Sequence, residues 1–223
     1  LETVKIPQSI KLMEYSAFIG CTSLKKVYYE GDIDSWCRID FEYSSNPLAN
    51  GGELYINEKP VVNIRISEQI EKIGKYTFEG CSSIKNVSLP ESVLIIEEYA
   101  FSECRSLEKI ELSNKLESIG DYSFSNCVSL YSITVPESVT SIGGDAFNGC
   151  ISLSDVKLPE NVDYVGEFAF YNCESLKSII LNEKLSRIGF SAFKMCDNLV
   201  ILGKINSYAL KYAEANNILF KAI

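Results

Sequence analysis

The stretch LEKIELSNKLESIGDYSFSNC, residues 107–127, decides the fold of this chain, because its pattern returns one period later as LYSITVPESVTSIGGDAFNGC, residues 130–150. The period is 23 residues, and each copy ends in a phenylalanine followed three places later by a cysteine. A period of this length predicts a solenoid, in which each unit buries its apolar face only by stacking on the next unit. The periodic cysteines after the first repeat are Cys81, Cys104, Cys127, Cys150, Cys173 and Cys196.

The first half of each unit has the spacing of a β-strand. Ile110 and Leu112 alternate with the charged Lys109 and Glu111, so that apolar side chains point to one face. A proline or a polar residue follows, and proline ends a strand ladder because it lacks an N–H group. We therefore predict one short strand at the start of each unit.

The second half of each unit predicts another short strand and a closing segment. Leu116 and Ile119 form a second apolar pair, and Gly120 follows them. We expect this glycine to allow a sharp corner with a positive φ, and residues 121–127 to close the coil as a helical turn. The expected fold is a repeat solenoid, mostly β with short helical turns, whose equivalent strands stack in parallel.

Two regions depart from the period. Residues 30–60 contain an insertion, in which Asp32 or Asp34 is a helix N-cap candidate and residues 54–62 resemble a hairpin. Its Trp36 either covers the edge of the core or belongs to a binding protrusion, and packing is the favoured interpretation. Residues 206–217 are predicted to form a helix, with Asn206 or Ser207 as its N-cap, and residues 218–223 are predicted to form a final strand.

No linker or low-complexity tract divides the chain, so one domain is expected over 1–223. It comprises a first repeat (1–29), the insertion with a short helix and hairpin (30–60), regular repeats (61–199) and a C-terminal cap (200–223). The chain starts on the first repeat position with no apolar signal segment before it, and we interpret it as a mature or excised fragment of a longer array.

The composition disfavours several classes of function. The net charge is −9 with no basic tract, which argues against nucleic acid as a partner, and no apolar run is long enough to span a membrane. There are eight cysteines, but a line of one thiol per unit suits neither disulfides nor a zinc site, so buried free thiols are expected. Cys37 lies outside the periodic column and is the one candidate for an exposed or redox-active thiol, although packing in the core is the favoured interpretation.

The chain also lacks the usual residues of an active site. It contains no histidine, which removes the commonest general base, and it has no phosphate-binding or calcium-binding loop. The pair Glu97 and Glu98 is interpreted as a surface feature of a repeat corner. We therefore expect no catalytic residue, no cofactor and no metal.

The candidate binding residues lie at positions that vary from unit to unit. Outward positions on the first strands would serve recognition, although unconstrained solvent-exposed positions vary in the same way. A second column is aromatic and includes Phe168; it would bind a sugar or a protein chain, or, as we favour, shield the corner. The candidates are Arg65, Lys109, Glu111, Tyr131, Thr134, Asp155 and Lys157 on the strands, and Tyr76, Tyr99 and Tyr122 in the aromatic column.

The repeated phrase resembles the BspA-type, or treponemal-type, leucine-rich repeat family. The resemblance implies a right-handed leucine-rich-repeat coil and a bacterial cell-surface or secreted protein that adheres to proteins of a host or of neighbouring cells. It supplies no binding residues, because the family's motif is structural. In one unit, the residues that carry it are Val156, Leu158, Pro159, Val165, Gly166, Ala169, Phe170 and Cys173.

These observations favour a non-catalytic, extracellular, protein-binding or adhesion scaffold, without membrane insertion by this chain. The alternatives are a carbohydrate-binding or spacer module attached to a secreted enzyme, with glycans as partners, and a free-standing enzyme. A monomer is expected, although Leu1 at an uncapped end would promote end-to-end dimers of the isolated chain.

Overall fold

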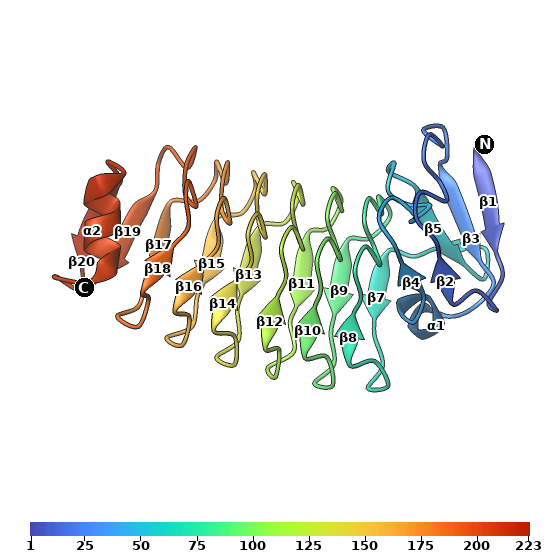
Figure 1. The fold of residues 1–223 in the computed structure, drawn as a ribbon, viewed down its shortest axis with the longest axis horizontal. Coiled ribbons are helices and arrows are strands. Elements are labelled where there is room, and N and C mark those ends of the chain that lie inside the picture. Colours follow the sequence, from blue (N-terminus) through green and yellow to red (C-terminus); the bar gives the residue numbers. More distant parts are fainter.

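The chain winds as a rod of successive coils, with its two termini at opposite ends (Figure 1). The computed structural model describes all residues, 1–223. Each turn of the coil, called a rung below, follows the 23-residue period: Lys109 pairs with Asn86, and Ile119 pairs with Ile142. The buried apolar side chains form one continuous cluster of 58 residues along the axis. The predicted solenoid of stacked parallel strands is thus confirmed.

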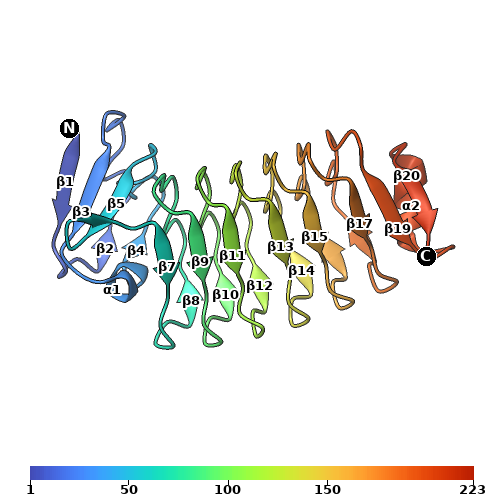
Figure 2. The ribbon, with the colours of Figure 1, turned by 180° about the vertical axis from the view of Figure 1, so that it is seen from behind.

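Each regular rung contributes a first strand of three residues and a second strand of two, in two separate rows, and the view from behind shows the same stacking (Figure 2). The first strands are β1 (Thr3–Ile6), β3 (Lys26–Tyr29), β5 (Glu53–Ile56), β7 (Asn63–Arg65), β9 (Asn86–Ser88), β11 (Lys109–Glu111), β13 (Ser132–Thr134), β15 (Asp155–Lys157), β17 (Ser178–Ile180) and β19 (Val200–Gly203). The second strands are β2 (Leu12–Met13), β4 (Asp40–Phe41), β8 (Lys72–Ile73), β10 (Ile95–Ile96), β12 (Ser118–Ile119), β14 (Ser141–Ile142), β16 (Tyr164–Val165) and β18 (Arg187–Ile188).

The closing segment of each rung is a series of tight turns and not a helix. Within residues 121–127, Ser125 N–H donates to the carbonyl of Tyr122, and Cys127 N–H donates to that of Phe124. Alternate N–H groups donate instead to the next rung, as from Phe124 to the carbonyl of Ala146 at 2.8 Å. Tyr122 and Asn126 have positive φ values of 56° and 58°, which a helix does not allow.

The glycine after the second strand is required by close packing and not by its φ. Gly120, Gly143, Gly166 and Gly189 are absent from the positions with positive φ, so the expected reason for this glycine was wrong. A Cβ atom at these four positions would come within 2.3–2.8 Å of backbone atoms of the preceding rung. Only glycine lets consecutive backbones approach so closely.

The periodic phenylalanines and cysteines fill the interior as continuous columns. The six rings from Phe78 to Phe193 stack with centroids 5.2–5.4 Å apart, and all are buried. From Cys104 on, each periodic thiol donates to the carbonyl of a phenylalanine in the preceding rung, as from Cys127 Sγ to Phe101 O at 3.1 Å. Cysteine therefore fills a small buried space and also satisfies a buried carbonyl.

Residues 30–60 are divided between two parts of the rod. Helix α1 (Ile33–Cys37) begins at the N-cap Asp32, whose side chain accepts from Ser35 N–H, and β4 after it pairs with β2. Trp36 is fully buried, and its Nε1 donates to the carbonyl of Thr77 at 2.9 Å, which confirms that it packs in the core. Strand β5 then joins β3, so the segment extends both strand rows.

The hairpin in this region lies earlier than the sequence indicated. Its second strand is β6 (Lys59–Pro60), antiparallel to β5, and does not include Val61 and Val62. The two turn residues, Asn57 and Glu58, both have positive φ, at 50° and 61°, as the tight two-residue hairpin turn requires. The hairpin expected within residues 54–62 is therefore present, with a connection of two residues between β5 and β6.

The C-terminal residues cover the last rung with a helix and a strand. Helix α2 (Tyr208–Ala215) has Ser207 as its N-cap and buries Ala209 and Ala213. Strand β20 (Leu219–Ala222) pairs in parallel with β19, so the two strands and the helix close this end of the rod. The predicted helix and final strand are both confirmed.

Candidate binding surface

The outward side chains of the first strands form one long exposed surface, called the strand face here. Arg65, Lys109 and Glu111 are exposed on it, and the strand register aligns Arg65, Ser88 and Glu111 in one column. Further along, Asp155 pairs with Ser132, and Lys157 pairs with Thr134. Tyr131 precedes β13 and is 48% exposed. The structure places all seven strand candidates at the surface, and their role in binding stays a prediction.

The strand face is interrupted, so its candidates fall into two groups. β11 pairs with β9 but not with β13, and β15 does not pair with β17. A shallow hollow of about 240 Å³ lies between β11 and β13, lined by Lys109, Glu111, Thr134 and Pro136 among others. Arg65, Lys109 and Glu111 therefore lie on one side of this hollow, and Thr134, Asp155 and Lys157 on the other.

Some charges of the strand face are already paired. Lys109 Nζ lies 2.8 Å from Glu111 Oε1, and this pairing raises the pKa of the lysine and lowers the pKa of the glutamate. Lys85 and Glu108 form a second pair at 3.0 Å. Both pairs are exposed to solvent, and such pairs contribute little to stability. The charged side chains of both pairs can therefore form ion pairs with a partner's charged groups instead.

The three candidate tyrosines stack on one another at the corner that follows the second strand. The ring centroids of Tyr76 and Tyr99 are 5.1 Å apart, and those of Tyr99 and Tyr122 are 4.6 Å apart with an interplanar angle of 5°. Burial raises the pKa of Tyr99 to about 12, with further contributions from Tyr122 and Tyr76. Each stacked contact covers one face of both rings, and both faces of Tyr99 are covered, which supports the shielding role.

The aromatic column is longer than the sequence indicated. Tyr43 lies 6.3 Å from Tyr76, and Tyr15 lies 5.5 Å from Tyr43, measured between ring centroids. At the other end, Phe190 contacts Phe168 at 5.6 Å. Tyr15, Tyr43 and Phe190 come one residue before the positive-φ position that the other rings occupy, so a strict period misses them. The corner column therefore consists of Tyr15, Tyr43, Tyr76, Tyr99, Tyr122, Phe168 and Phe190, with Asp145 between the last tyrosine and the first phenylalanine.

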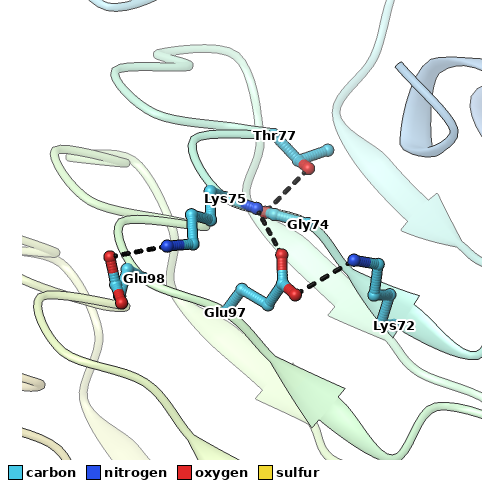
Figure 3. Close-up of polar contacts among 6 residues, drawn as sticks. All are labelled: Lys72, Gly74, Lys75, Thr77, Glu97 and Glu98. Atoms are coloured by element: carbon cyan, nitrogen blue, oxygen red, sulfur yellow. Dashed lines mark hydrogen bonds and ion pairs between the residues drawn. The ribbon is translucent and has the colours of Figure 1, made fainter. Parts of the chain in front are cut away.

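Carboxylates beside this column contact lysines of the neighbouring rung at the corner (Figure 3). Glu97 stands where other rungs have glycine; its Oε1 pairs with Lys72 Nζ at 3.0 Å, and its Oε2 accepts from the Lys75 N–H at 3.1 Å. Lys75 Nζ pairs with Glu98 at 3.1 Å. Both acids of the Glu97–Glu98 pair thus make surface contacts with neighbouring lysines.

Cys37 is buried, and its burial raises its pKa, which confirms the favoured interpretation that this thiol packs in the core. Helix α1 turns it inward beside Trp36, a direction that the repeat period does not specify. Cys21 in the first rung is the one cysteine that is partly exposed.

No three histidine, cysteine or acidic side chains converge as ligands for a metal ion. No helix of the structure has the length and apolar character needed to cross a membrane.

A coil with constant inward columns and a variable outer surface defines the class of leucine-rich-repeat solenoids. The family model of the BspA type leucine rich repeat region matches the chain in six copies, over residues 1–47, 52–155 and 117–221. The chain therefore belongs to the BspA-type leucine-rich repeat family.

Several solved structures are similar to this chain. The T. pallidum leucine-rich repeat protein is 32% identical over 73% of this chain and 85% of its own length, with a TM-score of 0.63. A leucine-rich repeat protein from Bacteroides ovatus is 25% identical over 90% of this chain, with a TM-score of 0.61, and this chain spans 63% of its length. The pneumococcal vaccine antigen PcpA shares the fold over 100% of this chain and 68% of its own, at 18% identity and a TM-score of 0.63. Among curated protein sequences, none matches this chain.

Proposed function

We propose that this chain is a non-catalytic protein-binding scaffold that acts at the cell surface or outside the cell. Its partners would be surface proteins of a host or of neighbouring cells, and the chain itself would be monomeric. The single observation that carries this proposal is the contrast between the two faces of each first strand: the inward positions are apolar in every rung, whereas the outward positions differ from rung to rung and are mostly polar or charged.

The shape of the rod supports a protein partner. A solenoid presents a long surface on rigid strands, and many individually weak contacts add up when several copies act together. The hollows of the strand face beside β9 and β11 are shallow and open, whereas a small-molecule site usually encloses most of its ligand. Membership in a family of repeat scaffolds and the fold shared with a pneumococcal antigen agree with a surface role.

Glycan binding is the alternative function, and the stacking of the tyrosines argues against it. A sugar ring packs against the open face of an aromatic ring. The faces of Tyr76 and Tyr99 are covered by neighbouring rings, so the corner column offers mainly edges.

The experiment is a parallel screen of the labelled chain against a surface-protein array and a glycan array. We expect saturable binding to one or a few proteins and none to glycans. Binding to glycans alone would reject the proposal, and so would turnover of a substrate by the isolated chain.

A pair of charge-matched triple variants then locates the surface. The variant Arg65→Glu, Lys109→Glu, Lys157→Glu reverses three charges on the strand face. The variant Lys115→Glu, Lys184→Glu, Lys211→Glu makes the same change in net charge at exposed positions elsewhere. We expect only the first to lose binding; equal losses would mean that net charge, and not the strand face, governs the interaction.

A further inference from the structure

The corner column of aromatic rings is interrupted at one rung. Tyr122 stacks on Tyr99 on one side, and no ring contacts its other side. Two rungs along, Phe168 begins the next aromatic group with Phe190 and Tyr171. The residue between them in this column is Asp145, which has the same positive φ, 53°, as Phe168. The backbone of this rung is thus shaped like its neighbours but carries a carboxylate in place of a ring.

The interruption has the size of one planar group. In the parallel phenylalanine column, neighbouring rings lie 5.2–5.4 Å apart, so a group at the rung of Asp145 would lie about one such step from both Tyr122 and Phe168. The preceding residues, Gly143 and Gly144, carry no side chains. At the position of Gly144 the neighbouring rungs carry the side chains of Asp121 and Glu167, so this corner is less filled than theirs. The position between Tyr122 and Phe168 that no ring occupies is called the opening below.

The charge around this opening is negative and unpaired. Asp121 and Glu167 are exposed and flank Gly144 in the adjacent rungs, and neither they nor Asp145 forms an ion pair. The hydrogen bonds of Asp145 and Asp121 are with neutral groups, Asn148 Nδ2 and Gly144 N–H, both at 2.6 Å. The Asp145 carboxylate also lies near the Tyr122 hydroxyl, and burial together with this carboxylate raises the pKa of Tyr122. Glu97 and Glu98, further along the same corner, have lysine partners instead.

The molecule itself shows that cations lie over aromatic rings of an adjacent rung, since Lys26 Nζ is 5.3 Å from the ring centroid of Tyr55. Arg187 lies over the ring of Tyr164, with its guanidinium carbon 5.2 Å from the ring centroid, and it follows Tyr164 by one period. A guanidinium is flat, stays charged, and both stacks on rings and pairs with carboxylates.

We propose that the opening between Tyr122 and Phe168 binds an arginine side chain of a protein partner. The guanidinium lies between the two rings and pairs with Asp145, while Asp121 and Glu167 supply the surrounding negative potential. This site rests on the proposed protein-binding function and adds the chemistry that one of its contacts recognises.

The test is an NMR titration of the chain with three blocked tripeptides, Gly-Arg-Gly, Gly-Lys-Gly and Gly-citrulline-Gly. Citrulline keeps the planar shape without the charge, and lysine keeps the charge without the plane. We expect shifts of Tyr122, Asp145 and Phe168 with the arginine peptide, weaker binding of the lysine peptide, and none of the citrulline peptide. Equal shifts from all three peptides, or none from arginine, would overturn the site.

Two substitutions at one position separate charge from shape. Asp145→Asn keeps the opening and removes the charge, and we expect about tenfold weaker binding of the arginine peptide. Asp145→Tyr completes the aromatic column and should abolish binding while the protein stays as stable as before. Asp155→Asn, on the strand face, is the control and should bind as the unmodified chain does. Unchanged binding by Asp145→Tyr would refute the proposal.

The outcomes distinguish this site from the function on which it rests. If the array identifies a protein partner whose affinity is unchanged in Asp145→Tyr, the scaffold function stands and the arginine site is wrong. Binding of the arginine peptide without any protein on the array would leave the site and reject the broader function. Binding of neutral glycans at Tyr122 would reject both.

Discussion

The interior phenylalanine column and the corner aromatic column run along the same rungs but differ in regularity. The interior rings keep centroid distances of 5.2–5.4 Å with interplanar angles of 2–16°. In the corner column the distances run from 4.6 to 6.3 Å and the angles from 5° to 80°, and Asp145 interrupts it. The two columns are built from the same kind of side chain, yet only one is uniform.

The difference follows from contact with solvent. A missing ring in the dry interior leaves a cavity that neighbouring rungs cannot fill, so every rung must supply the same volume. A missing ring at the corner is replaced by water or by a bound group. Variation is thus tolerated at the corner, and this is where one rung can acquire a property that the others lack.

The largest expected effect is the loss of one interior ring. Phe124→Ala should lower the free energy of unfolding by about 3–5 kcal/mol, through lost transfer free energy and the cavity left between Phe101 and Phe147. Urea denaturation followed by circular dichroism measures it. An unchanged midpoint would contradict the assignment of this column to the core.

The close approach of backbones at the glycine column gives the next effect. A Cβ at Gly166 would lie 2.5 Å from the backbone of Gly143, whereas at Gly74 the nearest atom is the Thr77 hydroxyl oxygen at 3.4 Å. Gly166→Ala should cost about 1–3 kcal/mol by overpacking, and Gly74→Ala less than about 1 kcal/mol. Thermal unfolding of the two variants compares them, and equal losses would show that backbone contact is not the reason for glycine.

Removal of a corner ring should cost less than removal of an interior ring. Tyr99→Ala loses two ring contacts, with Tyr76 and Tyr122, on a partly solvated edge, and we expect about 1–2 kcal/mol. The same urea experiment serves as the measurement. A loss as large as that of Phe124→Ala would remove the distinction between the two columns.

The smallest effect concerns Glu79, a partly buried acid beside Tyr76 and Tyr99. Burial, with a contribution from Glu103, raises its pKa from 4.5 to about 7. The folded state therefore favours the protonated acid, and this stabilisation is complete below pH 4.5 and is lost as the pH rises through about 7. Glu79→Gln should remove this loss and be more stable than the unmodified chain by about 1 kcal/mol at pH 8.

Stability curves of both proteins between pH 4 and pH 8 provide the measurement. Parallel curves would mean that Glu79 titrates with the same pKa in the folded and unfolded chain. Other acids shift both curves alike, so only their difference reports on this residue.

Much of the fold was predictable because each inward position meets the same surroundings in every rung. The recurrence of Ile110, Phe124 and Cys127 equivalents identified the strands and the core directly, and the N-caps Asp32 and Ser207 were each one of two candidates that local chemistry offered. Tyr15 and Tyr43 were missed because each lies one residue before the position that the repeat period indicates.

The sequence alone determined the coil, its period and which side chains face inward, since burial repeats with the chain. Only the tertiary structure decided what lies between rungs: that glycine is needed because backbones approach, that tyrosine faces are covered, and that residues 30–60 extend both strand rows. These are distances between residues one or more periods apart. The sequence pattern specifies which residue types recur in each rung, whereas the packing of one rung on the next sets the distances between the recurring residues.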